Sequence, residues 1–249
     1  MGRVIFIGAG PGAADLITLR GARLLATGQV VLYDALTDPA LRAMAPTARW
    51  LDVGKRGFGR AAAQAAIDAC LVHEALTNEC VVRLKGGDPS LFGRLEEELA
   101  ALTEHGIDFE IVPGVTAALA AAAHSARPLT RRGRGRSVSL STAMTRLGTL
   151  QAVRTADTEV YYMAGRQLAA LAKQLELAGW PADAPACVVS RAGWPDAITS
   201  SHPVAALADA AVLHAGRPAV VTVGAGAQAL ADKTPSNDRH VPVAPGCAA

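Results

Sequence analysis

Hydrophobic residues in the first half of the chain come in short continuous runs, and longer stretches separate these runs. A short continuous apolar run is typical of a buried parallel strand, and the longer stretches show the three-to-four-residue spacing of helices. Alternating strands and helices predict an α/β architecture, in which helices cover an open parallel sheet. We predict strands at residues 4–7, 30–33, 50–53, 81–84 and 107–112, with the longest helices at 61–76 and 96–105.

The second half of the chain shows the same two patterns, but its strands are spaced more like hairpins. This spacing predicts a second, smaller sheet of mixed strand direction. We therefore expect two α/β domains, at residues 1–113 and 114–231, and a mobile tail at residues 232–249, where Pro is frequent. We predict strands at residues 137–141, 159–163, 186–189 and 219–223, and helices at 117–124 and 168–178.

Glycine turns follow three of the predicted strands. Gly-Ala-Gly-Pro-Gly occupies residues 8–12, Gly-Gly-Asp-Pro residues 86–89 and Pro-Gly-Val-Thr residues 113–116. Ligands of open α/β sheets bind beyond the carboxyl ends of the strands, and glycine lets a ligand approach the main chain closely. The turns therefore predict a ligand site at one edge of the first sheet. A tight strand-to-helix turn with a solvated Asp88 is the alternative.

The first glycine turn differs from the fingerprint of dinucleotide-binding proteins, which is G-x-G-x-x-G. The third glycine would fall at Ala13, and Pro11 removes a main-chain donor from the place where a phosphate would bind. A dinucleotide-dependent oxidoreductase is therefore the less favoured interpretation.

Composition narrows the class of protein further. Of the 249 residues, 51% are hydrophobic and 18% are charged, which is typical of a globular chain and not of a disordered one. The four cysteines show no CxxC spacing, so we predict no metal site, and scattered free thiols suit a reducing compartment. No segment has the pattern of a signal peptide or a membrane span. We therefore expect a soluble, cytoplasmic protein.

Several short motifs occur in the order found in the tetrapyrrole methylase superfamily. By these motifs the chain resembles that superfamily over roughly residues 3–230, most closely its uroporphyrinogen-III C-methyltransferase branch, for which RLKGGDP-x-x-FGR is specific. The resemblance implies two α/β domains with S-adenosylmethionine bound in the cleft between them, usually in a homodimer. It also implies methylation of uroporphyrinogen III at C2 and C7 to give precorrin-2, for siroheme and cobalamin. The motifs are residues 8–12, Tyr33-Asp34, Gly54-Lys55-Arg56, residues 83–89, Phe92-Gly93-Arg94, residues 112–117 and Pro128-Leu129-Thr130.

The methyl donor that the resemblance implies is a sulfonium cation with an adenosine and an amino-acid tail, but no phosphates. It needs main-chain polar groups and a close apolar wall, so Pro11 in the first glycine turn is compatible with it. For Met163 taken alone, packing in the core is the alternative. By resemblance the donor contacts are Pro11, Gly86, Gly87, Asp88, Leu91, Thr116, Ala117, Met163 and Ala192, the last where the family often has Gly.

Two residues match the acid–base groups proposed for the family. Methyl transfer needs a nucleophilic pyrrole carbon aligned with the methyl group, and a proton must then leave the methylated ring system. By resemblance, Asp34 is the general base and Lys55 is the proton donor. Taken alone, Asp34 is typical of a cap for the helical segment that follows it, and Lys55 of a solvated loop cation.

An arginine-rich loop follows the helix predicted at residues 117–124. The implied substrate carries eight carboxylates, and guanidinium groups bind carboxylates through paired hydrogen bonds. A solvated loop is one alternative. RNA phosphate binding is another, but the net charge is only +2, and RNA surfaces spread basic residues over a face and add aromatics. This arginine loop comprises Arg131, Arg132, Arg134 and Arg136, spaced by Gly133 and Gly135.

The chain departs from the usual family pattern in three places on the expected acceptor side. Arg131 stands where His is common, residues 142–144 replace Thr-Gly-His, and residues 124–127 replace an aromatic residue followed by a Gly-Ile turn. A relative acting on a later corrin intermediate, or on rRNA, is therefore the alternative to a uroporphyrinogen-III methyltransferase.

Overall fold

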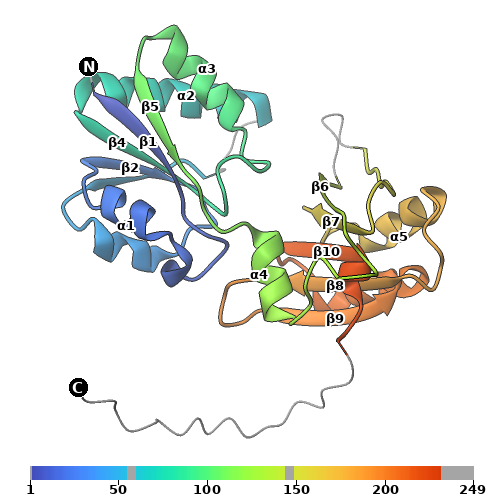
Figure 1. Cartoon of the computed structure of the whole chain (residues 1–249). Coiled ribbons are helices and arrows are strands. Elements are labelled where there is room, and N and C mark those ends of the chain that lie inside the picture. The colour runs from blue at the N-terminus through green and yellow to red at the C-terminus, as the bar shows by residue number, and fades with distance from the viewer. Residues whose placement is uncertain (1, 55–59, 144–148, 231–249) are drawn as a thin grey trace, which may run out of the picture.

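The computed structural model describes residues 2–54, 60–143 and 149–230, without the side chains of residues 60–63. Lys55, Met144 and the tail predicted at residues 232–249 lie outside the described residues. The described chain folds into two lobes, each built around a five-stranded sheet (Figure 1). The predicted α/β fold with two sheets is confirmed.

The first lobe contains an all-parallel sheet in the order β3-β2-β4-β1-β5. All of the strands predicted in this part of the chain are present, and the three central ones are buried on both faces, as their continuous apolar runs require. The strands are β1 (Arg3–Gly8), β2 (Val30–Tyr33), β3 (Arg49–Asp52), β4 (Cys80–Lys85) and β5 (Asp108–Val112).

Helices cover both faces of this sheet (Figure 1). One face packs against α2 (Arg60–Thr77) and α3 (Leu95–Glu104), and the other against α1 (Leu19–Leu25) and the 3-10 helix η2 (Pro39–Met44). Alternate residues of β1, β2, β3 and β4 enter the two apolar layers, as the two-residue period of a strand requires. A second 3-10 helix, η1 (Ala14–Leu16), follows the first glycine turn.

The second lobe contains a mixed sheet in the order β6-β7-β10-β8-β9. Only β6 and β7 are parallel, and the other neighbours are antiparallel. This sheet has as many strands as the first, so the prediction of a smaller sheet was wrong: β9 is an edge strand whose Ser, Thr and His residues give no apolar alternation. The strands are β6 (Val138–Thr142), β7 (Thr158–Tyr162), β8 (Pro185–Ser190), β9 (Ile198–Pro203) and β10 (Ala219–Gly224).

Helices also cover both faces of the second sheet. The helix α4 (Ala117–His124) connects the lobes and packs on one face together with η4 (Ala225–Ala227). The other face packs against α5 (Leu168–Leu177), η3 (Val204–Asp209) and α6 (Ala210–Leu213).

The carboxyl ends of the five parallel strands lie at one edge of the first sheet, because all five run in the same direction. The turns after β1, β4 and β5 therefore meet there, together with Asp34 after β2. Side chains and main chain of the second lobe contact this edge, as described below. We call this meeting place the junction.

Candidate functional site

Main-chain hydrogen bonds and Asp88 join the three glycine turns into one unit. Gly10 N donates to Gly87 O at 3.2 Å, and Gly87 N donates to Gly10 O at 2.7 Å. The Asp88 carboxylate accepts from Ser90 N through Oδ1 and from Gly114 N through Oδ2, each at 2.8 Å. The alternative of a solvated Asp88 is therefore wrong, because both of its oxygens hold main chain in place.

Gly114 and Gly86 lack a side chain for different reasons. A Cβ on Gly114 would lie 2.2 Å from Gly87 O and 2.7 Å from Gly8 Cα, so the packing of the turns excludes any side chain there. A Cβ on Gly86 would meet only Leu36 Cβ, at an ordinary 3.5 Å, and the φ of Gly86 is not left-handed. The described chain does not itself require glycine at position 86, which leaves space for a ligand against the main chain.

The second lobe presents Tyr162 and Met163 to the junction. Thr116 Oγ1 and Tyr162 OH are 2.6 Å apart, and the ring centroids of Phe92 and Tyr162 lie 5.0 Å apart between the lobes. Burial raises the pKa of the Tyr162 hydroxyl, so this hydroxyl stays protonated at neutral pH. Met163 is 56% exposed with a φ of 58°, so core packing is the wrong interpretation of it. Left-handed backbone at a non-glycine residue is typical of ligand sites.

The first glycine turn also contacts the second lobe. Ala13 N donates to Gly193 O at 2.8 Å, and a Cβ on Gly193 would lie 2.9 Å from Pro11 Cγ. Pro11 and the buried Ala192 therefore lie on either side of a contact between the lobes. Arg191, next to Ala192, has a left-handed φ of 52°.

Leu91 and Ala117 complete the set of predicted donor contacts. Leu91 N donates to Asp88 O at 3.2 Å, and Ala117 is the first residue of α4, directly after Thr116. The structure therefore places the predicted donor contacts at the junction or, for Met163 and Ala192, directly next in sequence to residues that line it. Their contact with a donor stays a prediction.

Asp34 lies at the same edge, directly after β2, with its side chain 33% exposed. Its Oδ1 accepts a hydrogen bond from Arg83 Nη2 at 2.7 Å. The helix-cap alternative is wrong, because Asp38 caps η2 by accepting from Ala40 N at 2.9 Å.

The turn after β3 approaches the same place. A Cβ on Gly54 would lie 3.0 Å from Ala35 Cβ, next to Asp34. Lys55 follows Gly54 in the sequence and lies outside the described residues. Its assignment as proton donor stays a prediction.

An ionic network that the sequence pattern did not predict lies behind Asp34. Arg83 Nε and Nη2 donate to Glu98 Oε1 at 3.1 and 3.0 Å, and Lys85 Nζ donates to Glu98 Oε2 at 2.8 Å. The side chains of Arg83, Lys85 and Glu98 are at most 3% exposed. Two cations at alternate positions of an otherwise apolar strand were the available signal, because buried charges need partners.

The pKa values of the two buried cations of this network shift in opposite directions. Burial and then the charge of Arg83 lower the pKa of Lys85, and the carboxylate of Glu98 only partly offsets them. Burial would also lower the pKa of Arg83, but two carboxylates, Asp34 and Glu98, outweigh it and raise that pKa. Arg83 is therefore the fixed positive charge of the network.

The structure does not bring the arginine loop to the junction. Arg136 N donates to Asp157 Oδ2 at 2.9 Å, beside the first residue of β7, whereas Met163 follows its last residue. The five residues of β7 separate the two, a length of about 17 Å at roughly 3.3 Å per residue. Arg131 Nε and Nη2 are buried without a hydrogen-bond partner among the described residues. The role of the loop toward an acceptor stays a prediction.

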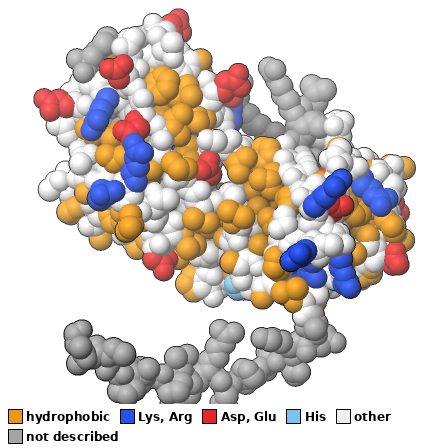
Figure 2. All heavy atoms as spheres, in the orientation of Figure 1, with side chains coloured by type: hydrophobic (Ala, Val, Ile, Leu, Met, Phe, Trp, Pro, Cys, Tyr) orange, Lys and Arg blue, Asp and Glu red, His pale blue; other side chains and the backbone are white. Residues whose placement is uncertain are grey.

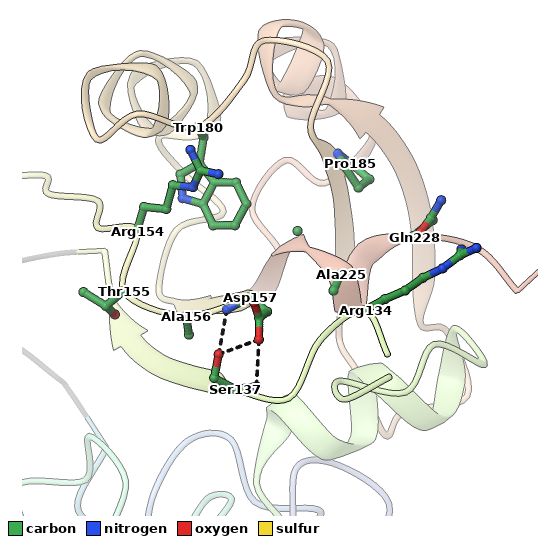
Figure 3. Close-up of a pocket in the computed structure, with 11 residues that line it drawn as sticks. Arg134, Ser137, Arg154, Thr155, Ala156, Asp157, Trp180, Pro185, Ala225 and Gln228 are labelled. Carbon is green, nitrogen blue, oxygen red and sulfur yellow. Dashed lines mark hydrogen bonds between the residues drawn. The ribbon is translucent and has the colours of Figure 1, made fainter. Parts of the chain in front are cut away.

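A pocket of about 510 Å³ opens beside the start of β7 (Figure 3). Arg134 and Arg154 line it, and the Arg154 guanidinium lies 5.0 Å from the ring centroid of Trp180. Asp157 and Ser137 are hydrogen-bonded to one another along its wall. None of the predicted donor contacts lines this pocket, so the convergence of residues places the candidate site at the junction instead.

Other kinds of site find no support in the part of the chain that the structure describes. There, no three side chains of His, Cys, Asp or Glu are grouped as a metal ion would need. Cys70, Cys80 and Cys187 are free thiols. No helix in the described ranges is both long and apolar enough to cross a membrane.

A parallel sheet with joined glycine turns, connected through α4 to a mixed sheet, defines a two-lobed class of α/β proteins. A sequence model for the family described as Tetrapyrrole (Corrin/Porphyrin) Methylases matches residues 3–208. The chain belongs to this family, as the resemblance predicted. Membership contradicts the alternative of a dinucleotide-dependent oxidoreductase.

Several named relatives show which members of the family the chain is similar to. The uroporphyrinogen-III C-methyltransferase of Pseudomonas aeruginosa is 42% identical over 195 residues, covering 77% of this chain and 80% of that protein. Siroheme synthase 2 of Halorhodospira halophila is 40% identical over 231 residues, 90% of this chain, but the chain spans only 47% of that protein's length. The uroporphyrin-III C-methyltransferase of Thermus thermophilus, crystallised with S-adenyl homocysteine, superimposes with a TM-score of 0.79 at 36% identity, covering 90% of this chain and 97% of that one.

Proposed function

We propose that the protein transfers methyl groups from S-adenosylmethionine to C2 and C7 of uroporphyrinogen III, giving precorrin-2 for siroheme or cobalamin. The observation that carries the proposal is the joining of the glycine turns through Asp88 at the junction, with open space beside Gly86. Two relatives support this proposal: the P. aeruginosa and T. thermophilus proteins are named as C-methyltransferases of this substrate class, and the T. thermophilus enzyme was crystallised with S-adenyl homocysteine.

The residues at the junction suit a methyl donor without phosphates. When bound, S-adenosylmethionine supplies an electrophilic methyl group on a sulfonium cation. Gly86 and Gly87 offer main chain that no Cβ covers, and Asp88 fixes the shape of that main chain. The half-exposed Met163 offers an apolar wall from the second lobe.

Asp34 has the geometry of a base for the deprotonation that follows transfer. The acceptor carbon forms a C–C bond as the C–S bond of the donor breaks, which leaves a neutral thioether and a positively charged ring system. That ring system must then lose a proton. Asp34 Oδ1 is held by Arg83, whereas Oδ2 has no protein partner among the described residues and is open to accept the proton.

Gly86→Ala separates donor binding from folding. We expect the variant to unfold at the same denaturant concentration as the wild type, because the added methyl group has space in the protein alone. Binding of S-adenosylhomocysteine should weaken by about 10- to 100-fold, since displacing a ligand from closely approached main chain costs roughly 1–3 kcal/mol. Isothermal calorimetry measures the affinity. Wild-type affinity in this variant would move the donor away from Gly86.

The arginine loop is tested separately as an acceptor contact. If its guanidinium groups bind acceptor carboxylates, Arg132→Ala combined with Arg134→Ala raises the KM for uroporphyrinogen III. The increase should be larger at low ionic strength, because salt screens exposed charges. Affinity for S-adenosylhomocysteine serves as the internal control and should not change. An unchanged KM at both ionic strengths would remove the loop from the acceptor site.

A homodimer and a cytoplasmic location complete the proposal. Exposed apolar side chains on β5 and α4, Phe109, Ile111 and Leu119, support a second copy as partner. Figure 2 shows apolar surface continuing from the first lobe onto the second. Light scattering at the protein concentration of the activity assay should give the mass of two chains. A monomer under those conditions would contradict the dimer.

A later corrin intermediate and rRNA are two alternative acceptors for methyl transfer from the same donor. Donor labelled in its methyl group is incubated with the protein and each acceptor in turn. We expect label in the tetrapyrrole fraction from uroporphyrinogen III and none in rRNA. Label that appears only with a corrinoid, or only with rRNA, would replace the acceptor and keep the methyl donor.

A further inference from the structure

Arg83 lies at the centre of the ionic network and is fully engaged. Its Nη2 donates both to Asp34 Oδ1, at 2.7 Å, and to Glu98 Oε1, at 3.0 Å. Its Nε donates to Glu98 Oε1 at 3.1 Å, and its Nη1 lies 3.3 Å from Leu84 O. Because a guanidinium is planar and rigid, these bonds leave it one orientation.

Asp34 is the single member of this network that reaches solvent. Its side chain is 33% exposed, whereas those of Arg83, Lys85 and Glu98 are at most 3% exposed. The network therefore extends from the interior of the first lobe to the surface at one point, beside the turn that carries Gly86. Two cations and two carboxylates balance each other in it, so Arg83 and Lys85 together neutralise Asp34 and Glu98.

Stability alone is a weak reason for such a network. Desolvation of buried charges offsets much of their mutual attraction, and apolar residues of similar size often give equal or greater stability. The neighbouring strand residues on this face of the sheet are apolar, among them Phe6, Leu32 and Val81. A function is therefore expected where the network emerges, which is at the Asp34 carboxylate.

We infer that Arg83, itself held by Glu98, is a positioning residue for the base: it fixes Asp34 Oδ1 and directs Oδ2 toward the acceptor. This role rests on the proposed function, in which Asp34 takes the proton. Glu98 on α3 prevents rotation of the guanidinium, and Lys85 holds the second oxygen of Glu98. Displacing a reacting group by about 1 Å can cost roughly 100-fold in rate, so a fixed carboxylate matters.

Arg83→Lys tests this role with the charge retained. A lysine ammonium lacks the planar fork and cannot hold both carboxylates in the same geometry. We expect kcat for uroporphyrinogen III methylation to fall by about 10- to 100-fold, with the KM for S-adenosylmethionine unchanged. Glu98→Gln provides a second variant, with a smaller change in the same direction, because its amide oxygen still accepts from Arg83.

A double-mutant cycle with Asp34→Asn separates positioning from structural damage. If Arg83 acts through Asp34, Arg83→Lys changes the residual kcat of Asp34→Asn by less than about twofold, because residues that act as a unit are not additive. The matched control is Arg49→Lys, which perturbs the ion pair of Arg49 with the mostly buried Glu74, at the start of β3 and far from the junction. It should lower stability and leave kcat at the wild-type value.

The two possible failures are distinguishable. Multiplicative effects of Arg83→Lys and Asp34→Asn, or wild-type kcat in Arg83→Lys, would overturn the positioning role and leave methyl transfer standing. A kcat loss in Arg49→Lys as large as in Arg83→Lys would overturn it too, because general destabilisation would then explain both. A wild-type protein that methylates no tetrapyrrole would overturn the proposed function itself.

Discussion

Asp34→Asn should lower the turnover of uroporphyrinogen III by about 10²–10⁴-fold, the usual effect of removing a general base. The asparagine side chain has the same shape and still offers an oxygen to Arg83, so the fold and the donor contacts should be preserved. Because the amide accepts a proton very poorly, the loss should appear in kcat. The affinity for S-adenosylhomocysteine, measured by calorimetry, should stay at the wild-type value.

Asp108→Asn is the matched control for this prediction. It is the same substitution at the exposed first residue of β5, at the end of the strand opposite the glycine turns. We expect wild-type turnover for this variant. Full activity of Asp34→Asn would remove the base assignment, although it would leave methyl transfer in place.

Among the substitutions proposed here, Gly114→Ala should lower the stability of the protein most. The added Cβ would lie 2.2 Å from Gly87 O and 2.7 Å from Gly8 Cα, and both neighbours are main chain that cannot turn aside. The glycine turns would have to separate, which would also stretch the bond from Gly114 N to Asp88. We expect the free energy of unfolding to fall by about 3 kcal/mol, the upper part of the range for overpacking.

Urea denaturation measures this loss, and Gly86→Ala is the comparison. Both variants add one methyl group to a glycine turn at the junction, but only position 114 lacks space for it. The midpoint should therefore move for Gly114→Ala and not for Gly86→Ala, whereas donor affinity should fall in both. Equal midpoints for Gly114→Ala and the wild type would show that the turns are less tightly joined than their hydrogen bonds indicate.

The central strands β1, β2 and β4 of the first lobe were predictable because each contains a continuous apolar run, and burial on both faces requires such a run. The edge strand β9 was not predictable, because it is polar, with the sequence ITSSHP, and it is a strand only through its antiparallel pairing with β8. The meeting of the glycine turns followed from strand direction alone, since the carboxyl ends of parallel strands share one edge.

The network behind Asp34 depends on tertiary contacts that sequence spacing does not give. Arg83 and Lys85 were visible as cations in an apolar strand, but their partner Glu98 is one of three consecutive glutamates, Glu96, Glu97 and Glu98. Only the packing of α3 on the sheet decides that Glu98 is the buried one. The position of the arginine loop had a similar cause: the direction of β6 and β7 places it at the far end from Met163.

The mass spectrum of the product shows whether uroporphyrinogen III is the acceptor and how many methyl groups it receives. Wild-type protein is incubated anaerobically with uroporphyrinogen III and excess S-adenosylmethionine. The tetrapyrrole is then extracted, and its molecular mass is compared with that from an incubation without the donor. We expect a tetrapyrrole heavier by two methyl substitutions, with a singly methylated species appearing first. An unchanged mass for uroporphyrinogen III, with the protein folded and binding S-adenosylhomocysteine, would contradict it.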